Sequence, residues 1–262
     1  MVTFVPTPIG NLDDITKRAV LALENAEIIF CEDTRVTKKL LNLLNIPLNK
    51  EFISMHSHNE DKVLAKTNPD TLKTKNVVYV SDAGMPAISD PGSKLVKFCQ
   101  THEIPYSVLP GANAALCAYA ASGFEGSFCF EGFLPHKGNE RAEKLKKIIN
   151  SPKITILYES PHRIEKLISE LKELIPQREI FLAKELTKIH ETYIKAKAKD
   201  LTIPNTKGEW VVVIDKSNES KELKLSYDEI LSLSLPAKEK SKLLAKISDK
   251  SAKEIYKELI NQ

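Results

Sequence analysis

The most informative stretch of this chain is Ser81-Asp82-Ala83-Gly84-Met85-Pro86-Ala87-Ile88-Ser89-Asp90-Pro91-Gly92. It follows the apolar run Val77–Val80, which predicts a buried strand, and it precedes a helical pattern over Lys94–Phe98. Strand–helix connections usually have about two to six residues, whereas this one has about twelve. Its two glycines let a ligand approach the main chain, and its two prolines restrict the backbone. Ligands of open α/β sheets bind beyond the carboxyl ends of the strands, so we predict a rigid binding loop here.

Strand and helix patterns alternate over residues 1–122, which predicts an N-terminal α/β domain with a mostly parallel sheet and helices on its faces. The expected strands are Val2–Pro6, Glu27–Glu32, Glu51–His56, Asn76–Asp82 and Pro105–Pro110. The expected helices are Ile15–Asn25, Val36–Leu44, Ser93–Thr101 and Ala112–Ala121.

A second α/β domain is expected over residues 123–216, after a hinge at Gly123–Ser127. The connection that follows Ala183 is too short for a crossover helix, so this sheet should be mixed or antiparallel. The expected strands are Phe128–Leu134, Ile154–Glu159, Glu179–Leu186 and Glu209–Asp215, with helices around Arg141–Ile149 and Ile164–Leu174.

Residues 217–262 predict a helical C-terminal extension, because their composition shifts to Lys, Glu, Ser and Leu. Ser226 followed by Glu229 has the spacing of a capping box. Two short helices are expected after it, over Lys238–Ile247 and Ala252–Ile260.

Composition limits the class of protein. The 262 residues are 42% hydrophobic and 28% charged, which suits a protein with two cores and a polar surface. A net charge of +3 neither requires nor excludes a nucleic-acid partner, because a basic patch can be local. The four cysteines form no CxxC pair, which favours free thiols in a reducing cytosol. No signal-peptide pattern and no membrane-length apolar run occurs, so we expect a cytoplasmic protein.

Three further loops of the first domain are typical of ligand contact. Pro6–Thr16 follows the first strand and contains Gly10 after two prolines. Cys31–Arg35 ends the second strand with acidic and basic side chains, although Asp33 also suits a helix N-cap. Leu109–Ala114 has small residues that let a bound group approach a helix N-terminus. We expect all of them on the rim that carries residues 81–92.

Loops of the second domain carry cations at the ends of strand-like runs, around Glu131–Lys137, Tyr158–Arg163 and Lys184–Lys188. Cations around one mouth are what phosphate contacts require, so we expect RNA-binding residues here. The expected RNA-binding residues are Lys137, Arg163, Lys184 and Lys188 of the second domain and Arg35 of the first.

Several common sites lack support. Neither GxGxxG nor GxxxxGK[ST] occurs, which argues against classical dinucleotide and P-loop sites. His56 and His58 form an HxH pair without a third ligand at suitable spacing, so we predict no metal site. Ser160 lacks a nucleophile-elbow context, so an acyl-transfer triad is not expected.

Taken together, the motifs resemble those of one family, in order over residues 2–215. The motifs are Thr7–Leu12, Glu32–Arg35, Ser81–Gly92, Phe130–Pro135 and Tyr158–Arg163. The sequence resembles the bacterial ribosomal small-subunit RNA methyltransferase I family, which belongs to the tetrapyrrole-methylase fold group. That resemblance implies two α/β domains of the tetrapyrrole-methylase type, a cofactor in the cleft between them, and a homodimer. Met85 departs from the threonine expected there, and His136 from a proline.

The resemblance implies an enzyme that uses S-adenosylmethionine to methylate the ribose 2′-hydroxyl of a cytidine in the decoding centre of 16S rRNA. Its substrate would be 16S rRNA or the small ribosomal subunit. Asp82 suits the ammonium or ribose of the cofactor, and the backbone of Ala112–Ala114 suits its carboxylate or adenine edge. The expected cofactor-binding residues are Pro8, Gly10, Asp82, Gly84, Met85, Pro86, Ala112, Asn113, Ala114 and Ser160.

Methyl transfer is an in-line displacement, so the protein mainly aligns the reacting atoms and excludes water. The attacking hydroxyl must lose its proton, and a carboxylate or a neutral imidazole within hydrogen-bond reach can take it. The candidate catalytic residues are Asp33, Glu159 and His162.

Two other functions stay open at this point. The wider fold group suggests methylation of a tetrapyrrole such as a corrin precursor, although Glu32–Arg35 and Tyr158–Arg163 favour the ribosomal branch. A non-catalytic RNA-binding module of ribosome assembly is the alternative from a different class. Such a module has no need of the rigid Asp-Gly-Pro loop at residues 81–92.

Overall fold

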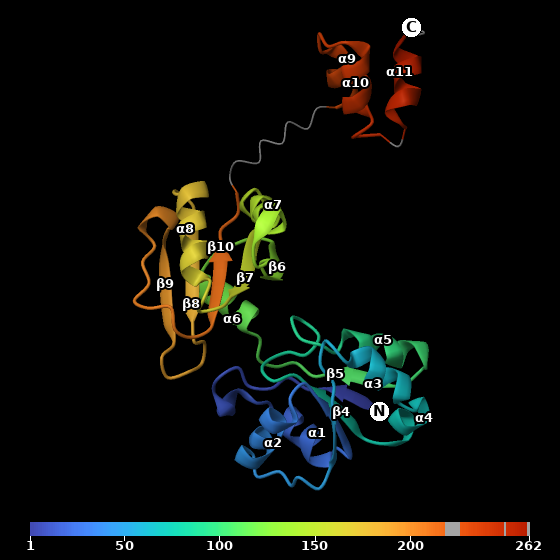
Figure 1. Cartoon of the computed structure of the whole chain (residues 1–262), viewed down its shortest axis with the longest axis vertical. Helices are drawn as coiled ribbons and strands as arrows, with labels where there is room; N and C mark the ends of the chain where they lie inside the picture. The colour runs from blue at the N-terminus through green and yellow to red at the C-terminus, as the bar shows by residue number, and fades with distance from the viewer. Residues whose placement is uncertain (218–225, 249, 261–262) are drawn as a thin grey trace. The chain divides into compact units, whose positions relative to one another are not determined.

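The computed structural model describes residues 1–217, 226–248 and 250–260. The chain forms two compact units, Met1–Asn218 and Glu219–Gln262. The first unit contains two five-stranded sheets with helices packed on them, and the described residues of the second form three short helices (Figure 1).

The first sheet is wholly parallel, in the strand order β3-β2-β4-β1-β5, as the alternating pattern predicted. Every residue of β2 and β4 is buried, which explains their unbroken apolar sequences: a parallel strand covered on both faces has no solvent side. The strands are β1 (Val2–Phe4), β2 (Ile28–Cys31), β3 (Glu51–Ser54), β4 (Val77–Val80) and β5 (Tyr106–Val108).

Helices cover both faces of this sheet (Figure 1). Leu23 and Leu41 bring α1 and α2 onto one face, and Leu72 and Leu95 bring α4 and α5 onto the other. The helices are α1 (Lys17–Asn25), α2 (Thr34–Leu43), α3 (Glu60–Lys66), α4 (Pro69–Thr74) and α5 (Ser93–Thr101), with a single 3₁₀ turn at Leu12–Asp14.

Side-chain caps fix where these helices begin. Thr16 accepts a hydrogen bond from the Ala19 amide, so α1 starts two residues later than its apolar pattern predicted. Asp33 accepts one from the Arg35 amide, so α2 starts two residues earlier than predicted. The sequence pattern missed α3 and α4 altogether, because these short helices bury few residues and show little periodicity.

The second sheet is mixed, in the strand order β6-β7-β10-β8-β9, as predicted. β6 and β7 are parallel, whereas β10 runs antiparallel to both β7 and β8. The strands are β6 (Phe128–Phe133), β7 (Ile154–Glu159), β8 (Glu179–Lys184), β9 (Thr192–Lys197) and β10 (Trp210–Ile214). β9 was missed, because this edge strand alternates exposed and half-buried residues and includes two lysines.

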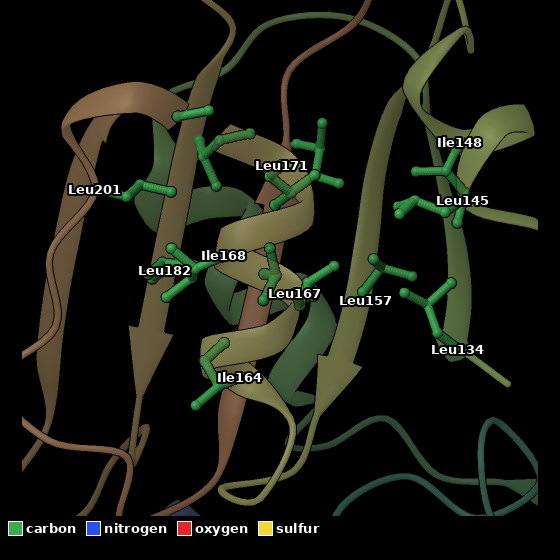
Figure 2. Packing of buried hydrophobic residues seen from close by; sticks show 14 of the residues in the cluster. Leu134, Leu145, Ile148, Leu157, Ile164, Leu167, Ile168, Leu171, Leu182 and Leu201 are labelled. Carbon is green, nitrogen blue, oxygen red and sulfur yellow. The ribbon is translucent and has the colours of Figure 1, made fainter. Parts of the chain in front are cut away.

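Alternate residues of these strands pack on opposite faces. On one face, Leu157 and Leu182 meet Leu167 and Leu171 of α8 (Ile164–Leu174), with α7 (Gly138–Ile149) beside it (Figure 2). On the other face, the small residues of α6 (Ala114–Ser122) pack on β7, β8 and β10. α6 therefore follows the first sheet in sequence but packs on the second.

The second unit consists of α9 (Tyr227–Ser232), α10 (Ala237–Leu244) and α11 (Ala252–Ile260) around a small core of Ile230, Leu244 and Ile255. The predicted capping box is confirmed at Ser226 and Glu229. Among the residues that the structure describes, no helix has both the length and the apolar character that crossing a membrane requires.

Candidate active site

Loops from both α/β halves of the first unit line one cavity of about 390 Å³. Ile9, Gly84 and Asn113 come from the loops after β1, β4 and β5, and Tyr158 and Ser160 come from the end of β7. A cavity of this size falls within the range of small-molecule sites. The convergence of both halves on one pocket, expected from the sequence, is thus present in the structure.

The loop over residues 81–92 is held at both ends. Thr7 and Gly84 exchange two backbone hydrogen bonds of 3.0 Å, which join the loop after β1 to the loop after β4. At the other end, the Gly92 amide donates to the buried Glu60 Oε1 at 2.8 Å. Within the loop, the Ala87 amide donates to the Pro91 carbonyl at 3.2 Å. Its cavity-lining atoms are therefore fixed by contacts outside the cavity.

Two glycines of this loop are required by geometry. Gly84 has a φ of 79° and Gly92 a φ of 124°, both in the region that favours glycine. A Cβ on Gly92 would also lie only 2.7 Å from the Tyr79 ring.

Gly10 has a different role from the one expected. Gly10 does not line the cavity. A Cβ on Gly10 would overlap the side chain of Lys188, which lies in the loop after β8. Next to it, the Asn11 amide donates to Thr187 Oγ1 at 3.1 Å. Gly10 thus allows the loop after β1 to approach the loop after β8.

The structure brings about half of the expected cofactor-binding residues together. Those that line the cavity are Gly84, Met85, Asn113, Ala114 and Ser160. Those that lie outside its lining are Pro8, Gly10, Asp82, Pro86 and Ala112. Asp82 instead accepts a 3.1 Å hydrogen bond from the Asp33 amide, so its carboxylate ties the loop after β4 to the start of α2.

Glu159 is the expected catalytic residue that does line the cavity, and it is almost completely buried. Its Oε1 lies 2.7 Å from Arg163 Nη2 and accepts a 2.8 Å hydrogen bond from the Ser160 amide. Its Oε2 lies 3.8 Å from Arg141 Nη1, and Arg141 pairs with Glu170 at 2.7 Å. Glu159 is therefore the centre of a buried ionic network at the cavity wall.

The other two expected catalytic residues do not line the cavity. Asp33 caps α2 and pairs with Arg35 at 2.5 Å. Hydrogen bonds from the side chain and amide of Arg35 lower the pKa of Asp33 to about 2. His162 is exposed, on the turn that leads from β7 into α8.

The five expected RNA-binding residues differ in accessibility. The Arg35 side chain is 89% exposed, and Lys137 is also exposed. By contrast, Arg163 is held by Glu159 and by the Leu134 carbonyl at 3.0 Å. Lys184 is only 8% exposed and donates to Asn205, and Lys188 pairs with Glu185 and Glu209. Arg35 and Lys137 alone present a side chain with wide access to solvent.

Sequence reasoning missed several cavity residues. Trp210 begins β10 and Glu209 directly precedes it. The antiparallel direction of β10 places its start beside the ends of β7 and β8, because Trp210 pairs with Glu159 and Lys184. Recognising that direction from the short connections would have found them. Asp90 lies within the stretch that we singled out, but no role was assigned to it.

Burial and mutual repulsion act on the carboxylates near this loop. The pKa of Asp90 is raised by burial and by the nearby Asp82, and that of Glu32 by burial and by Asp90 and Asp82. Burial also raises the pKa of Tyr158 to about 12; its hydroxyl accepts a 3.3 Å hydrogen bond from the Ala115 amide.

Comparisons with known proteins agree with this architecture. The model of the Tetrapyrrole (Corrin/Porphyrin) Methylases matches residues 1–202. The crystal structure of the methyltransferase CobJ superimposes with a TM-score of 0.61 at 21% identity, over 82% of this chain and 94% of that chain. For the uroporphyrin-III-C-methyltransferase of Thermus thermophilus the TM-score is 0.55 at 18% identity, with the same coverage. The fold is that of a tetrapyrrole methylase, and the family model places the chain in this class.

Curated relatives narrow this class. The Ribosomal RNA small subunit methyltransferase I of Campylobacter fetus is 50% identical over 270 residues, covering 99% of this chain and all of that protein. The protein of the same name from Helicobacter pylori strain J99 is 44% identical, covering 98% of this chain and 96% of that protein. The chain belongs to the ribosomal RNA small subunit methyltransferase I family, as the sequence motifs indicated.

Proposed function

We propose that this protein is an S-adenosylmethionine-dependent methyltransferase that methylates the ribose 2′-hydroxyl of a cytidine in the decoding centre of 16S rRNA. One observation carries the proposal: loops of both α/β halves line one cavity, in a chain that shares 50% identity with a protein named for small-subunit rRNA methylation.

The chemistry of the cavity lining fits the methyl donor. Ile9 and Val211 offer apolar surface for an adenine. Asn113 and Ala114 place the N-terminus of α6 at the cavity, where the helix dipole favours a carboxylate. When bound, S-adenosylmethionine supplies an electrophilic methyl group.

The residues of the chain would mainly bind, orient and exclude water, because the alignment of the reacting atoms accounts for much of the barrier in such a displacement. The hydrogen-bonded loop over residues 81–92 and the ionic network at Glu159 fix two walls of the cavity before anything binds. Walls fixed in advance lower the ordering cost of binding.

Support for an RNA substrate comes from the curated relatives, which share 36–50% identity with this chain and carry the ribosomal RNA name. The solved tetrapyrrole-biosynthesis enzymes share 16–21% identity, which bears on the fold alone. The exposed Arg35 and Lys137 are suitable for phosphate contacts.

The proposal includes the homodimer that the family resemblance implies. It also includes the cytoplasmic location and the three parts, residues 1–122, 123–216 and 217–262, that the sequence pattern predicts. Light scattering after size exclusion measures the mass, which a homodimer doubles, and limited proteolysis maps the boundaries.

The deciding experiment compares 16S rRNA from a wild-type strain with that from a strain that lacks the gene. Mass spectrometry of nuclease fragments should find one cytidine in the decoding centre without its 2′-O-methyl group in the deletion strain, restored by the plasmid-borne gene. Identical methylation in both strains would contradict the proposal. If the deletion strain instead lacks a methyl group on a base, the protein is still an rRNA methyltransferase, but the acceptor atom is not the ribose 2′-hydroxyl.

A further inference from the structure

Four titratable residues line the cavity, and proton transfer from a substrate hydroxyl needs one of them to have a basic atom that the substrate can reach. They are Asp90, Tyr158, Glu159 and Glu209. Their surroundings in the described part of the chain differ enough to separate them.

Glu159 is poorly placed to reach a substrate hydroxyl, because its side chain has no solvent-accessible surface. Arg163 and the Ser160 amide hold its Oε1. Its Oε2 accepts no hydrogen bond from the described residues, but it is buried and lies 3.8 Å from the equally buried Arg141.

Glu209 and Tyr158 are excluded as the proton acceptor for other reasons. The Glu209 carboxylate pairs with Lys188 at 2.8 Å, and its side chain is 79% exposed, so it lies at the rim rather than in a water-excluded wall. Tyr158 holds its proton at neutral pH because burial raises its pKa to about 12.

Asp90 meets the requirements that the other three fail. Its side chain is half-buried at the cavity, and no arginine, lysine or histidine of the described residues pairs with it. The hydrogen bonds from Ala87 to Pro91 and from Gly92 to Glu60 fix the backbone on either side of it. Asp90 is therefore a positioned carboxylate without a cationic partner.

We propose that Asp90 is the catalytic base of this site and that its carboxylate removes the proton of the substrate hydroxyl during methyl transfer. The inference rests on the proposed function. The hydroxyl oxygen forms a bond to the methyl carbon while the carbon–sulfur bond breaks, and that electron pair stays on sulfur, which becomes a neutral thioether. The hydroxyl proton passes to Asp90 and from there to solvent, so charge and atoms balance.

The neighbours of Asp90 are suited to this role. Burial and the negative charge of Asp82 raise its pKa, whereas a hydrogen bond with Ser81 lowers it. Glu32, Tyr79 and Tyr158 also interact with it electrostatically, and burial raises the pKa of each of them. No cation among the groups acting on Asp90 offsets this effect, so the carboxylate is a stronger base than a solvated aspartate.

The test compares Asp90→Asn, which removes the charge and keeps the shape, with the wild type. We expect kcat for methyl transfer to small subunits to fall by about 10²- to 10⁴-fold, the usual contribution of a general base. Calorimetric affinity for S-adenosylhomocysteine should stay within about twofold, because the inference gives Asp90 a role in proton transfer rather than in holding the donor. The wild-type rate should rise with pH to a plateau, and Asp90→Asn should lose that acid limb.

The matched control is Asp61→Asn, because Asp61 is an exposed carboxylate on α3 that pairs with Lys94 away from the cavity lining. It should keep both the rate and the acid limb. A normal rate or an unchanged acid limb in Asp90→Asn would overturn the inference, as would a large loss of S-adenosylhomocysteine affinity. If the wild-type protein transfers no methyl group to any rRNA, the proposed function is wrong, and the role of Asp90 inferred from it is wrong as well.

Discussion

Thr7 and Gly84, on two different loops, exchange a pair of 3.0 Å backbone hydrogen bonds beside the cavity. This bridge joins the exits of β1 and β4, which are adjacent in the sheet. Gly84 itself lines the cavity, so the bridge sets the position of a cavity wall.

Gly84→Ala should weaken ligand binding more than its size suggests. The residue has a φ of 79°, and a Cβ would lie 3.1 Å from Ile9 Cγ2, another lining atom. The backbone conformation alone costs about 1–2 kcal/mol for a non-glycine residue. We expect a melting temperature lowered accordingly and at least about fivefold weaker binding of S-adenosylhomocysteine by calorimetry. Unchanged affinity would remove Gly84 from the binding site.

Gly92→Ala should cost more stability, about 2–4 kcal/mol, because strain and overlap act together. Its φ is 124°, and the added Cβ would lie 2.7 Å from the Tyr79 ring. Gly123→Ala is the matched control: φ there is also positive, at 65°, but a Cβ would have no neighbour within 4 Å. Urea unfolding measures the free energy of unfolding of both variants. If both lose the same amount, the contact with Tyr79 is unimportant.

Arg163→Ala should lower stability by about 3–5 kcal/mol, because it leaves the buried Glu159 carboxylate without its closest partner. The salt dependence of RNA binding then separates two roles for this arginine. A structural residue leaves the slope of log K against log salt unchanged, whereas a phosphate contact reduces it by about one. Because Arg163 is largely buried, we expect an unchanged slope. A reduced slope would instead support the RNA contact that the sequence predicted for this residue.

Asp33 should titrate far below an ordinary aspartate. Arg35 lowers the folded-state pKa of Asp33 to about 2 from a usual value near 3.8. The ion pair therefore stabilises the folded state at pH values above the pKa that Asp33 has in the unfolded state. That contribution is lost as pH falls through about 2. Carboxyl ¹³C chemical shifts should show this low midpoint in the wild type and a higher one in Arg35→Ala. Equal midpoints would mean that the ion pair does not form in solution.

Long apolar runs made much of the first sheet predictable, because β2 and β4 are buried on both faces and contain no polar residue to confuse the pattern. The edge strand β9 carries no such signal, and α3 and α4 are too short to show a helical period. Pattern alone therefore misses short elements and strands that bury few residues.

The site was predictable as a set of loops but not residue by residue. Gly84 and Ser160 were found because each lies in a loop motif directly after a strand, β4 of the first sheet and β7 of the second. Asp82 lies in the same loop as Gly84, and Lys184 ends β8, yet their side chains contact the Asp33 amide and Asn205. Tertiary contacts of this kind leave no periodic trace in the sequence.

Hydrogen exchange with and without S-adenosylhomocysteine shows whether residues from both α/β halves form one donor site. We expect slower amide exchange on binding in residues 83–90 and in residues 158–161 within one ligand titration, with a common midpoint. Protection confined to one half, or two separate midpoints, would contradict it.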